Sequence, residues 1–527
     1  QGFFLMAKDI HWADKAAENL IYKNPKKKLF TLAAGISPSG TVHIGNFRDL
    51  ITAEAVSRAL KDKGKKVRFL FSWDEYDRLR KIPKNISKNF EKYIGLPYSE
   101  VPNPFEKKGS YAEHFEKELE KDLPKLGVTP EFIYQAKMYA SGKYKKEIIE
   151  AMKKRKQIAL ILADFRTQGF TKKEIENYYP LEIYCEKCNK DFTKIDLYNE
   201  KTNEVEYSCK CGNKNKVNIK EKNIGKLQWK VDWAMRWKYE DVCFEPGGKD
   251  HSSPQGSYQV ARRISKEVFN FEPPMYQPYD FIGLSGLSSK MSGSTGINVS
   301  PGSLLNIYEP ELLRWLFLRT LPTKQFDFCF DSEIIRQYDE FDREQKNYKD
   351  LKESKRRALE LSKVKNNFVS KDNISFRLIG SIGQITQGNI REVQRILKET
   401  GDKSNKDSVK RRLVLSQNWI SKFSPENKIE LVNNEKYFKK LSKNEKESLI
   451  NFFSNIEDNW SLDKLTSLAY EVPKQEGLDE QQLKKRQREF FKNVYMFLIG
   501  KETGPRLPTF LISIGKDKIK DIVKSII

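Results

Sequence analysis

Apolar residues form a short run at residues 29–34 (LFTLAA), and the turn sequence GISPSGTVHIGN follows it directly. Beyond the turn, residues 47–63 carry apolar side chains at helical spacing, and Gly64 follows as a helix stop signal. A second apolar run, VRFLFSW at residues 67–73, favours another strand. Strand, tight turn, helix and strand in this order predict an α/β fold with a parallel, doubly wound sheet.

The turn after the first strand has the composition of an anion site. The first amides of a helix have no internal partners and lie at the positive end of its dipole, so a phosphate can bind there. His43 adds a side-chain donor, and we expect Gly35 and Gly40 to adopt backbone conformations closed to other residues. Such turns also occur without a ligand, so a partner motif is needed to decide.

The middle of the chain changes pattern. Residues 81–110 are rich in proline and asparagine and predict a loop-rich insertion, whereas residues 111–168 read as helices with lysine-rich faces. Three tryptophans, Trp229, Trp233 and Trp237, follow at i, i+4 and i+8. A helix places them on one face, as either a core stripe or one wall of a pocket.

Four cysteines lie between these segments. Cys185, Cys188, Cys209 and Cys211 form a C-x2-C and a C-x-C pair that twenty residues separate. Two such pairs can converge into a tetrahedral thiolate site, so we expect a structural zinc ribbon over about residues 181–225. Free thiols are the alternative, because the second pair has one intervening residue fewer than the first.

Two further loops carry candidate chemistry. Residues 245–258 (EPGGKDHSSPQGSY) predict a loop that leads into a helix and presents His251 to a ligand. After a short strand at residues 281–284, a loop rich in glycine and serine has Lys290 and Met291 at its centre. A mobile basic loop can close over a triphosphate and neutralise charge as a phosphoanhydride breaks.

Composition limits the classes of protein that fit. A chain of 527 residues predicts two to four domains, and a net charge of +24 favours a polyanionic partner, although AT-rich codon usage produces the same bias. The chain has no apolar run of the ~20 residues that a membrane span needs, no signal-peptide pattern and only six cysteines, so we expect a cytoplasmic protein.

Helical patterns dominate the C-terminal part, at residues 331–370, 405–424, 441–456 and 478–499.

The turn at residues 38–46 and the loop at residues 290–294, together with the segments between them, resemble a known family. PSGTVHIGN at residues 38–46 is similar to the first signature of class I aminoacyl-tRNA synthetases, with Asn46 in place of the usual histidine. KMSGS at residues 290–294 is similar to the second signature, with Gly293 where a second lysine is common. The segments AGISPSG, SWDEYDRLRKIP, WKVDWAMRW and EPGGKDHSSPQGSY resemble the class I form of lysyl-tRNA synthetases, and the resemblance covers essentially the whole chain.

The resemblance implies a Rossmann-type catalytic domain at residues 1–330, a helical stem-contact region at 331–400 and an α-helical anticodon-binding cage at 401–527. It implies ATP-dependent attachment of L-lysine to tRNA(Lys) through a lysyl-adenylate, with Mg²⁺ on ATP, in a monomer. The alternatives are a class I synthetase for glutamate, arginine or cysteine, a non-catalytic tRNA-binding paralogue, and a small-molecule nucleotidyltransferase.

Site residues carry over from the resemblance position by position. His43, Lys290 and Ser292 are the expected catalytic groups. The expected ATP-binding residues are Pro38, Ser39, Gly40, His43, Gly45, Asn46, Lys290, Met291, Ser292 and Ser294. The expected amino-acid-binding residues are Gly35, Ser37, Asp74, Trp229, Asp232 and His251. Asp74 and Asp232 are unranked candidates for binding the lysine ammonium, whereas a glutamate pocket would need Arg236 or Arg262.

Overall fold

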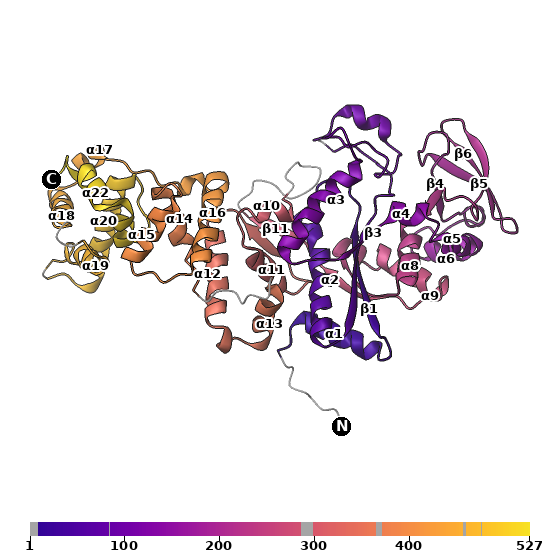
Figure 1. The fold of residues 1–527 in the computed structure, drawn as a ribbon, viewed down its shortest axis with the longest axis horizontal. Coiled ribbons are helices and arrows are strands. Elements are labelled where there is room, and N and C mark those ends of the chain that lie inside the picture. Colours follow the sequence, from indigo (N-terminus) through magenta and orange to yellow (C-terminus); the bar gives the residue numbers. More distant parts are fainter. Residues whose placement is uncertain (1–8, 84, 286–298, 365–371, 457–459, 476) are drawn as a thin grey trace, which may run out of the picture. The chain divides into compact units, whose positions relative to one another are not determined.

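The computed structural model describes residues 9–83, 85–285, 299–364, 372–456, 460–475 and 477–527 (Figure 1). The chain divides into two compact units. The first contains Gln1–Leu305, Pro310–Phe328 and Lys349–Phe368, and the second contains Asn306–Glu309, Cys329–Tyr348 and Val369–Ile527.

A five-stranded sheet forms the centre of the first unit, and all its neighbouring strands are parallel. Its strands, in spatial order, are β10 (Met275–Tyr279), β9 (Val242–Gly248), β1 (Leu29–Ile36), β2 (Lys66–Trp73) and β3 (Glu131–Tyr134). The order reverses between β1 and β9, and open parallel sheets bind ligands beyond the strand ends at such a reversal. The predicted doubly wound sheet is confirmed.

Helices cover both faces of this sheet. On one face α2 (Ile44–Asp62) packs against β1 and β2 and is in turn covered by α1 (Trp12–Lys23) and α11 (Pro310–Leu318). Helix α2 is buried along most of its length because elements pack on it from both sides. Ala33 and Leu70 pack on the opposite face, against α8 (Trp229–Glu240) and α9 (Ser257–Glu267).

The segment after β2 follows the predicted loop pattern, because the described residues of 81–110 contain just one short helix, η1 (Lys88–Tyr93). One prediction in the next segment is wrong. Residues 111–168 form α3 to α6 as expected, but they also contain β3, which forms the sheet edge beside β2. The helices are α3 (Tyr111–Asp122), α4 (Gln135–Ala140), α5 (Lys145–Lys153) and α6 (Arg155–Asp164).

The cysteine segment folds as a small antiparallel unit. Strands β5 (Thr193–Asn199), β6 (Glu204–Cys209) and β7 (Lys214–Asn218) form a three-stranded sheet. Beside it, β4 (Leu181–Ile183) pairs with β8 (Gly225–Leu227), so the first and last strands of the insertion lie next to each other. A ribbon architecture was the prediction, and the strands confirm it.

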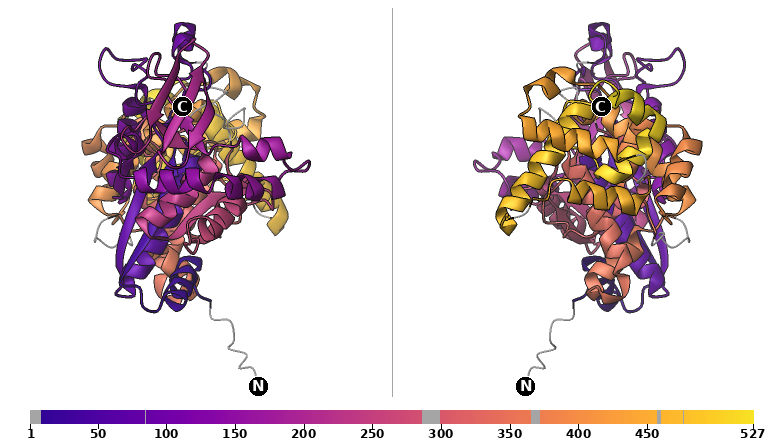
Figure 2. Two further views of the ribbon diagram at one scale, coloured as in Figure 1. Left: turned by 90° about the vertical axis from the view of Figure 1, so that its right-hand side faces the viewer. Right: turned by 90° about the vertical axis from the view of Figure 1, so that its left-hand side faces the viewer.

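Helices joined by loops make up most of the second unit's described residues, and the predicted helices at 405–424, 441–456 and 478–499 are confirmed. Its helices include α12 (Glu333–Lys346), α14 (Phe376–Ile385), α15 (Ile390–Glu399), α16 (Lys406–Phe423), α18 (Lys443–Ser454), α19 (Leu462–Glu471), α20 (Glu480–Ile499), α21 (Leu507–Ile514) and α22 (Lys516–Val523). The right-hand view of Figure 2 faces these helices, drawn in orange to yellow. Buried Arg412 pairs with Glu309 and Asp342 there.

Within the described residues, no helix is both long and apolar enough to cross a membrane.

Candidate functional site

The turn between β1 and α2 presents His43 at the start of a helix. His43 is the N-cap of α2, and its Nδ1 accepts a hydrogen bond from the Asn46 amide at 3.3 Å. Burial lowers the pKa of His43, so its imidazole is neutral near pH 7. Because Nδ1 is the acceptor, the ring proton resides on Nε2, which is then available to donate to an anion.

The turn was predicted to need Gly35 and Gly40 for backbone angles closed to other residues, and this prediction is wrong. Steric contacts, rather than backbone angles, explain the glycines at Gly35 and Gly45. Neither Gly35 nor Gly40 is among the glycines with positive φ. A Cβ on Gly35 would lie 2.9 Å from the Ser72 carbonyl oxygen, so the close approach of β1 to β2 requires glycine. A Cβ on Gly45 would lie 3.0 Å from His43 Nδ1 and crowd the capping ring.

The other part of the predicted ATP site falls outside the described residues. Lys290, Met291, Ser292 and Ser294 all lie within residues 286–298. The strand expected before them is present as β11 (Ile282–Ser285), which pairs with β12 (Phe326–Cys329). In the turn that follows Pro38, the Ser39 carbonyl accepts a hydrogen bond from the Tyr111 hydroxyl at 2.8 Å.

Asp74 and Asp77, which follow β2, are already matched with cations, whereas the buried Glu75 between them accepts hydrogen bonds from the Gln135 and Ala136 amides. Arg236 bridges the two predicted ammonium ligands, with Nη1 at 2.7 Å from Asp74 Oδ1 and Nη2 at 3.0 Å from Asp232 Oδ2. Lys226 pairs in the same way with Asp77, whose Oδ2 accepts a hydrogen bond from the Ser37 hydroxyl at 3.1 Å. All five charged side chains are largely or fully removed from bulk water.

The tryptophan helix forms one wall of this region. The predicted i, i+4, i+8 stacking is confirmed, because the rings of Trp229 and Trp233 stack at 5.1 Å and Trp237 follows at the same separation. The Arg236 guanidinium lies 5.3 Å from the centre of the Trp229 ring. His251, whose side chain is 40% exposed, lies with its ring 6.0 Å from that of Trp233.

Sequence reasoning missed two buried carboxyl groups in this region, Asp49 beside Gly35 and Glu245 beside the tryptophan helix. Asp49 on α2 accepts a hydrogen bond from the Gly35 amide at 3.2 Å. Glu245 on β9 accepts one from Trp233 Nε1 at 3.0 Å and another from Trp237 Nε1. Burial raises the pKa of Asp49 well above its ordinary value and that of Glu245 to about 7, and the charge of Glu245 adds to the shift at Asp49.

Neither carboxylate forms an ion pair within the described part of the chain. The sequence held weak signals for both. Asp49 interrupts the apolar pattern of α2 at a position that the packing buries. Glu245 stands in a segment expected to be a loop, but residues 242–248 form β9, and a Cβ on Gly247 would lie 2.2 Å from the Tyr276 hydroxyl oxygen.

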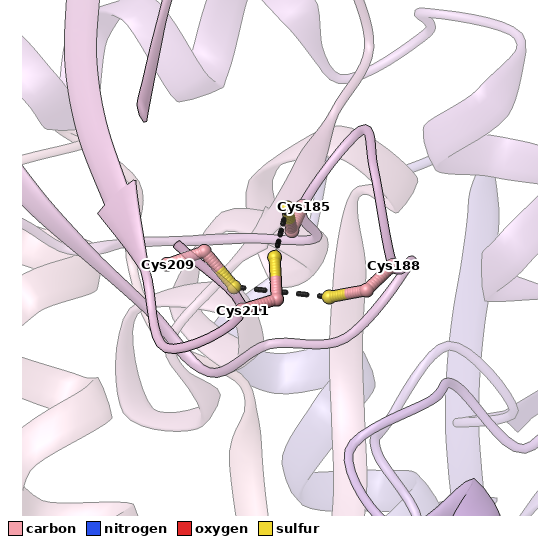
Figure 3. Close-up of side chains that lie close together, drawn as sticks. All are labelled: Cys185, Cys188, Cys209 and Cys211. Carbon is pink, nitrogen blue, oxygen red and sulfur yellow. Dashed lines mark hydrogen bonds between the residues drawn. The ribbon is translucent and has the colours of Figure 1, made fainter. Parts of the chain in front are cut away.

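Four thiols converge at the base of the ribbon (Figure 3). Sγ atoms of Cys185 and Cys211 are 3.7 Å apart, as are those of Cys188 and Cys209, and all four lie within 4.8 Å of one another. Tetrahedral Zn²⁺ with Zn–S bonds of about 2.3 Å places its sulfurs about 3.8 Å apart. The cluster therefore has the dimensions of a site that can hold a metal ion.

The family model for class I (K) tRNA synthetases matches residues 10–366. This chain belongs to that family. The match includes the β1–α2 turn, the acidic strand ends, the ribbon and the tryptophan helix described above. The family resemblance noted from the two signatures is thereby confirmed.

Curated relatives align along almost the entire chain. The lysine–tRNA ligase of Borreliella burgdorferi is 38% identical over 98% of this chain and 99% of its own. That of Treponema pallidum is 36% identical over 97% and 98%, and that of Pyrococcus horikoshii is 34% identical over 96% and 98%. A glutamate–tRNA ligase structure from Elizabethkingia meningosepticum aligns at 12% identity with a TM-score of 0.46, a likeness too low to support conclusions.

We expect Arg236→Met to destabilise the first unit by about 3–5 kcal/mol, because it leaves Asp74 and Asp232 buried without their cation. Urea unfolding followed by tryptophan fluorescence measures the change. Arg263→Met is the matched control, because its pairs with Asp164 and Glu267 are largely exposed and should contribute less than about 1 kcal/mol. Equal losses in both variants would contradict a special role for the buried bridge.

Proposed function

We propose that this chain is an ATP-dependent lysine–tRNA ligase, which activates L-lysine as lysyl-adenylate and transfers it to tRNA(Lys). The observation that carries the proposal is the charge pattern of the pocket. Arg236 is neutralised by two carboxylates, so it is not free to bind the side chain of a glutamate substrate, and Arg262 lies at an exposed position of α9 rather than among the buried residues of this region. The family match and the near full-length relatives agree with this substrate.

The proposed first step joins the lysine carboxylate to the α-phosphate of ATP. His43, through Nε2–H, and the first amides of α2 near Gly45 and Asn46 bind phosphate oxygens. Pro38, Ser39 and Gly40 shape this turn. Lys290, with Met291, Ser292 and Ser294, stabilises the departing pyrophosphate, and Mg²⁺ neutralises the triphosphate. The aminoacyl group then passes to the terminal ribose of the tRNA, with no covalent enzyme intermediate.

The lysine side chain occupies the region bordered by Gly35, Ser37, Trp229 and His251 in this proposal. Asp74 and Asp232 contribute through Arg236, which they hold against Trp229. We assign the ε-ammonium to Glu245, supported by Asp49. Both are buried and have no ion pair among the described residues; Asp49 lies against the Gly35 amide and Glu245 against the indole N–H groups of Trp233 and Trp237.

The decisive experiment is amino-acid-dependent ATP–pyrophosphate exchange with lysine, glutamate, arginine and cysteine, each with and without tRNA. We expect exchange with lysine alone, and charging of tRNA(Lys). Exchange with glutamate would reassign the substrate. Retention of tRNA binding in a gel shift with no exchange for any amino acid would identify a non-catalytic paralogue instead.

Glu245→Gln should raise the KM for lysine about 10- to 100-fold, because hydrogen bonds to charged groups contribute about 1.5–3 kcal/mol. The KM for ATP should stay unchanged. Exchange at saturating tRNA measures both constants. Glu240→Gln, at the end of α8 and paired with Arg68, makes the same chemical change outside the pocket and is the control.

The wild-type pH profile gives an independent check of this assignment. Since the pKa of Glu245 is about 7 without ligand, protonation below that pH removes the attraction for the ammonium. The lysine KM should therefore rise as pH falls from 8 to 6 in the wild type, and this rise should be smaller in Glu245→Gln. Glu245 would be excluded from the lysine site if Glu245→Gln changed the KM for lysine less than about threefold. An equal change in the KM values for lysine and for ATP would exclude it as well.

The four cysteines are proposed to hold one structural Zn²⁺. We expect about one zinc per chain by elemental analysis, and its loss in Cys188→Ser, because a tetrahedral thiolate site needs all four ligands. Cys243→Ser is the control, since that thiol donates to the Thr31 carbonyl far from the ribbon and a hydroxyl can do the same. Zinc retained by Cys188→Ser would argue against the assignment.

We further propose that the enzyme is a cytoplasmic monomer.

A further inference from the structure

Lys226 is a buried lysine at the base of the insertion that carries the four cysteines. It lies on β8, the last strand of that insertion, and its side chain is only 7% exposed. Its Nζ pairs with Oδ1 of Asp77, in the loop that follows β2. The other oxygen of this carboxylate, Oδ2, accepts a hydrogen bond from the Ser37 hydroxyl at 3.1 Å. Three side chains in series thus join the insertion to a residue that borders the proposed lysine site.

The backbone is fixed on both sides of Lys226. Lys226 is opposite Glu182 in the β4–β8 register. A Cβ on Gly225 would lie 2.1 Å from the Glu182 carbonyl oxygen, so β8 lies closer to β4 there than any other residue would allow. On the other side, the Leu227 amide donates a hydrogen bond to the Tyr139 hydroxyl at 3.1 Å. The fold of the insertion therefore determines where the Lys226 side chain begins.

Both members of the Lys226–Asp77 pair carry their charge. Burial opposes the charged form of each group, but mutual attraction outweighs it, so the pKa of Lys226 is raised and the pKa of Asp77 is lowered. An ionised carboxylate has no proton and can only accept hydrogen bonds. The Ser37 hydroxyl therefore donates its single proton to Asp77.

This hydrogen bond determines what Ser37 can offer to a ligand. A hydroxyl has one donor and two acceptor lone pairs, so Oγ can only accept once its proton is used. Within the described part of the chain, no group donates a hydrogen bond to this oxygen, and Ser37 is only half-buried. An ammonium group satisfies such an acceptor, whereas a carboxylate has no proton to donate and is repelled by Asp77.

We propose that Lys226 is a positioning residue of the amino-acid site, whose ion pair with Asp77 fixes the Ser37 hydroxyl as an acceptor for an ammonium group of the substrate. Without Lys226, the buried Asp77 can take up a proton and donate to Ser37, and the hydroxyl proton is then free to face the ligand. The inference rests on the proposed function and adds two residues to the recognition of its substrate.

The first test is Lys226→Met, measured by ATP–pyrophosphate exchange. The KM for lysine should rise about 10-fold or more, the effect of losing one hydrogen bond to a charged group, whereas the KM for ATP should change less than about twofold. Lys222→Met is the matched control, because Lys222 belongs to the same insertion and pairs with Glu186 at the surface. An unchanged KM for lysine in Lys226→Met would overturn the inference.

A double-mutant cycle shows whether Lys226 acts through Ser37. In a Ser37→Ala background no hydroxyl remains to be oriented, so Lys226→Met should raise the KM for lysine no further. Effects that multiply in the double variant would show that Lys226 acts independently of Ser37, and they would overturn the inference. Zinc content and the midpoint of thermal unfolding show that each variant is folded.

A second double variant separates positioning from stability. Lys226→Met with Asp77→Leu replaces the buried pair by apolar side chains, an exchange that proteins often tolerate without loss of stability. If the pair has only a structural role, this variant should recover a KM for lysine close to that of the wild type. We expect the KM to stay raised, because the Ser37 hydroxyl has lost its acceptor.

The outcomes separate this inference from the proposed function. If the wild type activates lysine but the cycle shows no coupling between Lys226 and Ser37, the positioning role fails and the enzymatic proposal stands. If the wild type activates a different amino acid and the KM for that amino acid shows the coupling, the positioning role stands and the assignment of lysine fails.

Discussion

Parallel pairing of β1 with β2 on one side and with β9 on the other is the constraint on which the site depends. Parallel strands end at the same sheet edge, so the turn after β1, the acids after β2 and the end of β9 meet there although about 200 residues separate them. The spacing of β1 and β2 also dictates Gly35, because any side chain would strike the Ser72 carbonyl. The open backbone beside Gly35 is therefore a consequence of strand packing.

Charge compensation decides what this edge can bind. A cation buried among carboxylates persists only when it is paired, and Arg236 and Lys226 are paired with Asp74, Asp232 and Asp77. Their matching leaves other buried carboxyl groups without an ion pair. Glu75 accepts from the Gln135 and Ala136 amides, whereas Asp49 and Glu245 lie near the tryptophan helix and Gly35, and burial raises the pKa of both. An ammonium ligand lowers the cost of ionising these two groups, whereas a carboxylate ligand would add to it.

The spacing of residues within one segment was enough to predict the secondary structure of that segment. The Trp229–Trp237 stripe, the strands around the cysteine pairs and helix α2 all follow from periodicity within one segment. Strand β3 was missed because only four residues pair with β2 inside a helical stretch. Asp49 and Glu245 were missed because their role depends on which distant cations are already paired, and a single sequence does not give these pairings.

The chain carries a net charge of +24, yet its proposed substrate lysine is itself a cation. The two facts are compatible because they act over different distances. Exposed charges are screened beyond about 8–10 Å at physiological salt, so the surface repels free lysine weakly while its many charges together attract a polyanionic RNA. Among buried groups screening is much weaker, and the carboxyl groups of Asp49 and Glu245, which have no ion pair, ionise more readily beside an ammonium group. Basic residues outside and acidic residues inside thus allow one protein to bind an RNA and a cationic amino acid at the same time.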